Sequence, residues 1–262
     1  MKKAFLFVLI LALGAVPTFA QGDPTNTVSF NGFSFSFDPA LAANVNITQF
    51  AGDPVDLDQP GGPQPPYTEF LLYNDLPAPE SFFDGAGGIR VYRVADMAGY
   101  TEYETRLQAL QTLLTDRPDF AQFGPTADNP SGTALPFLPV FAAAQVIRAR
   151  AVYVETPAVL GISYVTAYRQ DAYPFLGNEF IYTFQGFTPD GQFYVSAIFR
   201  LDTTLFPAEV PADFDYEAFI ENLSTYMEES VATLNAGVPE DFTPSLATLD
   251  AIVQSFSFEA MG

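Results

Sequence analysis

Glu-Phe-Ile-Tyr-Thr-Phe-Gln-Gly-Phe-Thr-Pro-Asp-Gly-Gln-Phe-Tyr-Val, residues 179–195, is the stretch that decides the fold of this chain. Within it, Thr188-Pro189-Asp190-Gly191 is a turn sequence, because Pro presets a turn φ and Gly accepts a positive one. The turn joins two segments rich in aromatic and β-branched residues, which predicts strands at 178–188 and 191–200. Along the second strand, side chains alternate between two faces.

Similar segments lie on both sides of this hairpin. Two upstream segments predict strands at 145–155 and 160–169, so that the four strands make an antiparallel meander at the centre of a sheet. Further strands are predicted at 28–37 (with a tight turn at Asn31-Gly32), 45–50, 67–73 and 88–94, and helices at 38–43, 101–116, 219–234 and 243–253. The pattern predicts an α+β fold, with helices packed on an antiparallel sheet.

Specific capping residues mark where two of these helices should begin. Thr101 and Glu104 have the spacing of a capping box, so we expect Thr101 to be an N-cap. Thr243 is expected to cap a later helix, with Pro244 at its first position.

The first twenty residues have the pattern of a signal peptide. Lys2 and Lys3 precede an apolar run from Ala4 to Val16, and small residues stand three and one positions before Gln21. The run is too short to cross a bilayer, and no later stretch is long enough. We therefore expect residues 1–20 to be removed and residues 21–262 to form a single domain, secreted or periplasmic, without a membrane anchor.

Charge restricts the partners of the mature chain. Lys2 and Lys3 are the only lysines, so cleavage changes the formal net charge from −21 to −23. Such a surface repels nucleic acids and anionic lipids, since phosphate binding depends on Lys and Arg. A neutral ligand, a protein partner or a multivalent cation remains compatible with this charge.

Missing side chains restrict the chemistry. The chain has no His, Cys or Trp, and the mature part has no Lys. These absences remove Ser-His-Asp hydrolysis, thiol catalysis and Schiff-base chemistry. Carboxylate chemistry remains, and a hydrolase acting on a neutral extracellular polymer would need two carboxyl groups about 5–10 Å apart in a cleft.

Two sets of residues are candidate sites. Asp53, Asp56 and Asp58 lie close together in a loop rich in Pro and Gly, where oxygen ligands could hold Ca²⁺ and stabilise the module. Arg148 and Arg150 are two positions apart on a predicted strand, so they should project from one face and could bind a carboxylate ligand. The alternatives are a solvated acidic loop and arginines paired internally with Asp or Glu.

Parts of the chain resemble known families. Residues 179–195, with Pro-Phe-Leu-Pro-Val-Phe-Ala-Ala-Ala-Gln-Val-Ile-Arg-Ala at 136–149, resemble a family of uncharacterised exported bacterial proteins over about residues 135–200. Gly-Phe-Ser-Phe-Ser-Phe-Asp-Pro at 32–39, together with the predicted helix running into Phe258, resembles the PsbP/Mog1-like fold. The first resemblance implies export and brings no known activity or catalytic residues with it, and the second implies a sheet with packed helices.

The sequence as a whole favours a non-catalytic binding or structural module outside the cytoplasm. An exposed sheet face or groove with contiguous aromatic side chains would support this hypothesis. A sheet covered on both faces would weaken it.

Overall fold

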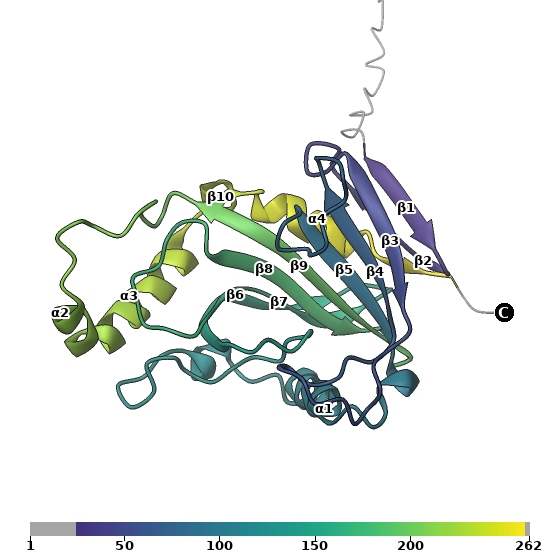
Figure 1. Cartoon of the computed structure of the whole chain (residues 1–262), viewed down its shortest axis with the longest axis horizontal. Helices are drawn as coiled ribbons and strands as arrows, with labels where there is room; N and C mark the ends of the chain where they lie inside the picture. The colour runs from purple at the N-terminus through teal and green to yellow at the C-terminus, as the bar shows by residue number, and fades with distance from the viewer. Residues whose placement is uncertain (1–24, 260–262) are drawn as a thin grey trace, which may run out of the picture.

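The computed structural model describes residues 25–259, and the predicted signal peptide lies outside them. An eight-stranded antiparallel main sheet dominates the described chain (Figure 1). Seven of its strands follow the order β3-β4-β5-β9-β8-β7-β6, and the short β10 pairs with β9. Their bounds are β3 (Asn44–Phe50), β4 (Tyr67–Tyr73), β5 (Gly87–Arg93), β6 (Ala144–Glu155), β7 (Leu160–Arg169), β8 (Phe180–Phe187), β9 (Phe193–Thr203) and β10 (Phe242–Thr243).

A small sheet and four α-helices complete the fold of residues 25–259. The small sheet has the order β1-β2-β11, so the C-terminal strand pairs with the N-terminal hairpin. The bounds are β1 (Asn26–Phe30), β2 (Phe33–Phe37), β11 (Ser257–Phe258), α1 (Thr101–Asp116), α2 (Tyr216–Glu221), α3 (Leu223–Ala236) and α4 (Leu246–Gln254). Single-turn 3₁₀ helices lie at Val94–Met97, Phe120–Phe123 and Pro239–Asp241. The α+β class and the antiparallel sheet are confirmed.

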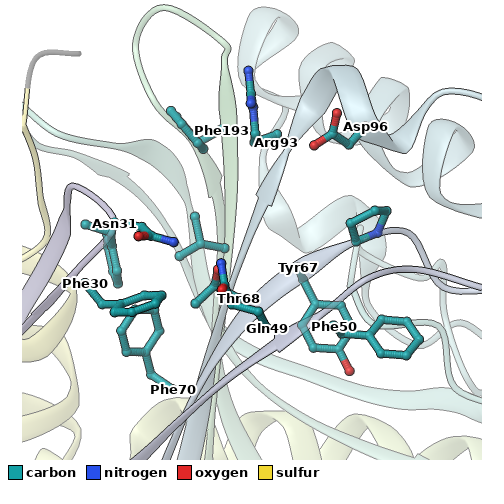
Figure 2. Close-up of a pocket in the computed structure, with 13 residues that line it drawn as sticks. Phe30, Asn31, Gln49, Phe50, Tyr67, Thr68, Phe70, Arg93, Asp96 and Phe193 are labelled. Atoms are coloured by element: carbon teal, nitrogen blue, oxygen red, sulfur yellow. The ribbon is translucent and has the colours of Figure 1, made fainter. Parts of the chain in front are cut away.

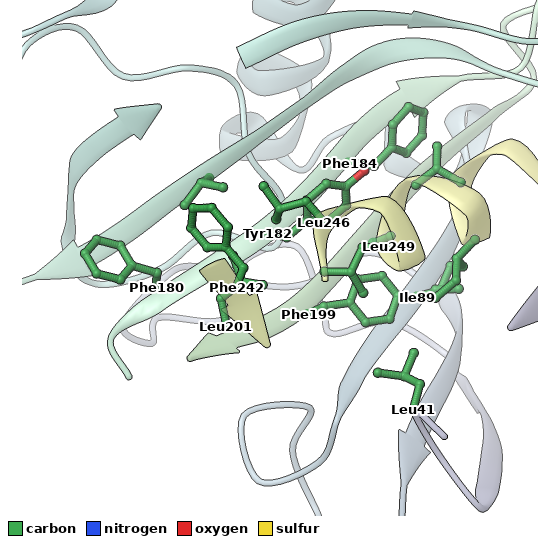
Figure 3. Close-up of a cluster of buried hydrophobic side chains, with 14 of the residues drawn as sticks. Leu41, Ile89, Phe180, Tyr182, Phe184, Phe199, Leu201, Phe242, Leu246 and Leu249 are labelled. Carbon is green, nitrogen blue, oxygen red and sulfur yellow. The ribbon is translucent and has the colours of Figure 1, made fainter. Parts of the chain in front are cut away.

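Two layers cover the main sheet. The small sheet, α3 and α4 bury one face, and Figure 3 shows side chains of β8 and β9 packed against Leu246 and Leu249 of α4. Helix α1 and the segment 135–141 bury the other face. As a result, every residue of β8 is buried. Apart from the half-buried Phe193, the aromatic side chains of residues 179–195 are therefore core residues, and this covering of both faces weakens the prediction of an open aromatic sheet face.

The four strands at 145–200 pair with one another in chain order. They extend from the middle strand, β9, to the edge strand, β6, and therefore form one half of the sheet. β9 joins this half to β5 and the N-terminal strands. The predicted alternation in β9 is confirmed, because Val195 and Phe199 pack in one core cluster while Tyr194 and Ile198 pack in the other.

The predicted hairpin at 28–37 is confirmed. Asn31 and Gly32 have φ values of 50° and 79°, the left-handed conformation that a two-residue hairpin turn requires. The predicted helix at 38–43 is wrong. A carboxylate oxygen of Asp38 accepts a hydrogen bond from the Ala40 amide at 2.8 Å, which closes a single turn before β3 begins.

Both predicted caps are also wrong, although the two helices exist. Tyr100 precedes the first residue of α1, so Thr101 is already helical. Thr243 is part of β10, and α4 begins three residues later. The helix predicted at 219–234 is two helices, α2 and α3, separated at Asn222.

A group of tyrosine rings lies beneath α1. Around Tyr92, the rings of Tyr67, Tyr103 and Tyr194 have centroids 5.5, 6.0 and 6.1 Å away. Burial raises the pKa of Tyr92 to about 12, against the opposing effect of nearby Arg90. The Tyr92 hydroxyl is buried, and Arg90, although close enough to lower the Tyr92 pKa, does not reach hydrogen-bond geometry with it, so the hydroxyl is unpaired among residues 25–259.

Tyr92→Phe is expected to raise the free energy of unfolding by about 1 kcal/mol at pH 7, because it removes a buried, unsatisfied hydroxyl. Since the folded-state pKa is above the ordinary value of 10, Tyr92 also makes wild-type stability fall as pH rises from 10 to about 12. Over that window the free energy of unfolding should fall less in Tyr92→Phe than in the wild type, with a difference of up to about 1.4 kcal/mol per pH unit. Urea unfolding at several pH values measures both effects.

Tyr164→Phe is the matched control. The Tyr164 hydroxyl donates to the Pro136 carbonyl at 2.8 Å, and it accepts from the side-chain Nε2 of Gln145 at 3.3 Å. This substitution should therefore destabilise the protein at pH 7. Equal effects of the two substitutions would contradict the assignment of Tyr92 as unsatisfied.

Candidate functional site

A groove opens where the small sheet diverges from the main sheet. It has a volume of about 350 Å³ and is lined by residues of the β1–β2 turn, β3, β4, β5 and the start of β9 (Figure 2). Its aromatic members, which define what we call the aromatic groove, are Phe30, Phe33, Phe50, Tyr67, Phe70 and Phe193.

The floor of the aromatic groove is the end of one face of the main sheet. Gln49, Thr68 and Val91 are direct neighbours in register across β3, β4 and β5. Two residues beyond Val91, Arg93 of β5 pairs with Phe193 of β9, and alternation places both side chains on this same face. The small sheet ends at its turn before it covers these residues, which leaves an uncovered strip of sheet.

Core contacts hold the wall of the groove in place. The Phe33 ring packs against Phe70, with centroids 5.4 Å apart, and against Phe258 of β11 at 5.0 Å. Phe193 also stacks on Phe258, with centroids 5.3 Å apart and an interplanar angle of 27°. Phe193 and Phe30 are half-buried, so each ring is fixed yet still contacts solvent. The wall is therefore preorganised to meet a ligand.

A second aromatic pair lies beside the groove but alternates to the opposite face of the main sheet from Gln49 and Thr68, where Tyr67 packs against Tyr92. Phe50 and Tyr67 have ring centroids 5.0 Å apart, and the Arg90 guanidinium lies 4.3 Å from the Tyr67 ring centroid. Arg90 is fixed in turn by Glu69 at 2.7 Å. Burial raises the pKa of Tyr67, so its phenol stays neutral at physiological pH.

Polar groups at the groove are few, and their charges balance. Asn31 and Gln49 are exposed amides, and Thr68 adds a hydroxyl. Arg93 and Asp96 are the charged residues of the lining, and both are exposed. One positive and one negative group make the groove neutral, although the chain as a whole has a formal charge of −21. This balance suits a neutral ligand.

The predicted calcium residues are not gathered into a metal site. The Asp53 carboxylate accepts hydrogen bonds from the Gln64 amide at 2.8 Å and the Gln59 side chain at 3.0 Å. Asp53 thus closes its own loop, while Asp56 and Asp58 are exposed. Within residues 25–259, no group of three or more acidic residues is arranged to hold a metal ion.

The prediction that Arg148 and Arg150 share a face is wrong. A β-bulge lies between Ala149 and Val152, and Arg150 has a positive φ of 54°. Because the bulge breaks the two-residue alternation, the two side chains diverge.

Each arginine is bonded to backbone carbonyls. Arg148 is 5% exposed and donates to Phe123 and Gln145, at 3.1 and 2.7 Å. Burial lowers its pKa to about 10. Arg150 donates to carbonyls at the C-terminal end of α3, which include Leu234 at 3.3 Å. Neither contact is the predicted pairing with Asp or Glu.

Sequence reasoning missed the aromatic groove. Its only local signal is the Asn31-Gly32 turn between Phe30 and Phe33, which also fits an ordinary hairpin. The other lining residues meet only when β3, β4, β5 and β9 pair in the main sheet and the N-terminal hairpin packs against them.

Comparison with known proteins adds no assignment: the chain matches no protein-family model and no curated protein. In the described part of the chain, no helix has the length and hydrophobicity needed to cross a bilayer.

Proposed function

We propose that the protein is an exported, non-catalytic binding module that takes a neutral ligand into the aromatic groove. The observation that supports this most is an uncovered strip of sheet flanked by fixed aromatic rings, with balanced charges at its margin. Pockets that bind small ligands are commonly apolar, with a few placed polar groups, and have volumes of roughly 300–1,000 Å³. A volume of about 350 Å³ suits one ring or a short segment of a longer molecule.

A sugar ring is the ligand class that best fits the lining. Its flat face can pack on Phe30 or Phe193, and its hydroxyls can bond to the amides of Asn31 and Gln49. Export is part of the proposal and rests on the signal-peptide pattern, which predicts a secreted or periplasmic setting. The resemblances to exported bacterial proteins and to the PsbP/Mog1-like fold are compatible with this role.

The hydrolase alternative has less support. The aromatic groove offers one carboxylate, Asp96, where glycoside hydrolysis needs two. Another cavity is lined by Asp190 and Glu259, but hydrogen bonds from Thr188 and the Gln192 amide lower the pKa of Asp190. A general acid needs a raised pKa, so Asp190 could serve only as the ionised carboxylate of such a pair.

The test is thermal unfolding of the mature protein against a panel of neutral oligosaccharides. A ligand at one hundred times its dissociation constant should stabilise the protein by about 2.7 kcal/mol. Phe193→Ala should weaken binding at least about tenfold, since it removes a ring from the wall. Phe83→Ala, at an exposed ring outside the groove, is the matched control and should bind like the wild type.

Two outcomes would contradict the proposal. One is a panel in which no neutral oligosaccharide shifts the unfolding midpoint. The other is a ligand whose affinity falls equally in Phe193→Ala and Phe83→Ala, which would place its site elsewhere.

A further inference from the structure

A second cavity lies beneath the junction of α3 and α4. It has a volume of about 270 Å³ and shares no lining residue with the aromatic groove. We call it the bulge cavity, because Arg150, Ala151 and Val152 of the β6 bulge form one side. Strands β7 and β8, the end of α3 and one side of α4 complete it.

The bulge and a small side chain create this space. Val152 lies opposite Ser163 in register, and Ser163 lies opposite Phe184 on its other side. A serine in that row fills less volume than the apolar residues around it, and it is only 2% exposed. Since Val152 is 51% exposed at the edge strand, the cavity opens to solvent there.

One wall presents a carboxylate. The Tyr182 hydroxyl donates to a carboxylate oxygen of Asp250 at 2.8 Å, which fixes the side chain of Asp250 on α4. Figure 3 shows the Tyr182 side chain projecting from β8 toward α4. The hydrogen bond uses one acceptor site of the carboxylate and leaves others for a ligand.

Arg150 lines the same cavity, and its guanidinium lies 5.8 Å from the centroid of the Phe242 ring. Among the described residues, the side-chain hydrogen bonds of Arg150 all use Nη1, and they run to carbonyls at the end of α3. Nε and Nη2 thus have no hydrogen-bond partner within residues 25–259 and keep their capacity to donate to an anion. The Arg150 amide also donates to the Asn235 side chain at 2.6 Å, which fixes the bulge.

Arg150 and Asp250 have opposite charges and line one cavity, but they do not pair. Neither takes part in an ion pair within residues 25–259, where the ion pairs are Arg90–Glu69, Arg117–Glu155 and Arg169–Glu179. Two half-buried charges of opposite sign that do not pair with each other would both be satisfied by a ligand that carries a negative group for Arg150 and a positive group for Asp250.

We propose that the bulge cavity binds a small zwitterion, an α-amino acid, with its ammonium group on Asp250 and its carboxylate on Arg150. The apolar side chains of Val165 and Leu246 would contact an aliphatic side chain of the ligand. The limited volume restricts the ligand to a small amino acid. This site is independent of the aromatic groove.

Calorimetric titration of the mature protein with L-alanine, L-valine and L-proline tests the proposal. For whichever amino acid binds, the N-acetyl derivative and the carboxamide each lack one charge. Each derivative should bind at least about tenfold more weakly than the free amino acid. Equal binding of either derivative, or no binding of any amino acid up to about 10 mM, would overturn the proposal.

Two variants locate the site. Asp250→Asn keeps an acceptor for Tyr182 but removes the charge, so it should weaken amino-acid binding at least about tenfold. Ser163→Val keeps both charges, fills the cavity and should abolish binding. Asp96→Asn, in the aromatic groove, is the matched control and should bind like the wild type. Circular dichroism establishes that each variant is folded, and unchanged binding in folded Asp250→Asn would refute the assignment.

Discussion

Phe184→Ala is expected to lower the free energy of unfolding by about 3–5 kcal/mol, the range for a fully buried aromatic ring replaced by Ala. The Phe184 ring has no solvent exposure, and it packs edge-on against Phe256 with centroids 5.8 Å apart. The ring also covers two glycines, Gly161 of the neighbouring strand β7 and Gly186 of its own strand β8. A Cβ atom at Gly161 or Gly186 would lie only 2.7 or 2.4 Å from ring atoms.

The glycines explain why the loss should be near the upper end of that range. They are direct partners in register across β7 and β8, and the ring occupies the space that their missing side chains leave. Two adjacent backbones cannot easily move inward to fill the cavity left by Phe184→Ala. Equilibrium urea unfolding, monitored by circular dichroism, measures the loss.

Phe83→Ala is the control for the same chemical change at a surface position. Phe83 is 41% exposed and contacts Phe82 and Phe141. It should cost less than about 1 kcal/mol, as substitutions away from the core commonly do. A loss below about 1 kcal/mol in Phe184→Ala would contradict the packing described here.

Regular elements were predictable because their signals are local. Alternation and turn residues placed the β8–β9 hairpin, and a helical apolar stripe placed α1. The side-chain pattern in β9 followed directly from the two-residue period. What each face packs against was not predictable, since α1 and α4 are far from β9 in the sequence. For this reason, aromatic residues that could have formed an open face turned out to be core.

The arginine prediction failed at a bulge. The two-residue rule holds only while a strand is regular, and Arg150 adopts a positive φ although it is not a glycine. No residue type marks that position in the sequence. Arg148 stays in the core, whereas Arg150 reaches the end of α3, 84 residues further along the chain. The carbonyls of that helix end are a partner that only the tertiary structure supplies.

The acidic loop shows the same limit in another form. Three carboxylates that are close in sequence can share a metal only if the loop turns them toward one point. The Asp53 carboxylate instead bonds to Gln59 and Gln64, which closes the loop on itself. The aromatic groove was out of reach for a related reason, because it forms between the N-terminal hairpin and strands β3 to β5.

Gln185→Leu is expected to lower the free energy of unfolding by about 3–4 kcal/mol, because several buried hydrogen bonds are lost at once. Gln185 has no solvent exposure. Its side-chain oxygen accepts from the Leu138 amide at 3.0 Å, and its nitrogen donates to the Leu138 carbonyl at 3.1 Å. The same nitrogen donates to Ser196 at 3.0 Å.

These bonds fix the segment 135–141 on the main sheet, because Gln185 pairs with Leu138 as a neighbouring strand would. Leucine at position 185 preserves the volume but leaves the amide and carbonyl of Leu138 buried with one partner fewer each. Equilibrium urea unfolding gives the loss, and the exposed Gln192→Leu is a control that should change stability by less than about 0.5 kcal/mol.

Hydrogen exchange gives a second, local measurement of the same variant. The Leu138 amide should exchange faster in Gln185→Leu than in the wild type by more than the change in global stability requires, because its acceptor is gone. Amides of β3, on the far edge of the main sheet, should follow the global change alone. Uniform acceleration would mean that Gln185 stabilises the sheet as a whole. Selective acceleration at Leu138 would establish that one buried amide side chain holds this segment against the second face of the sheet.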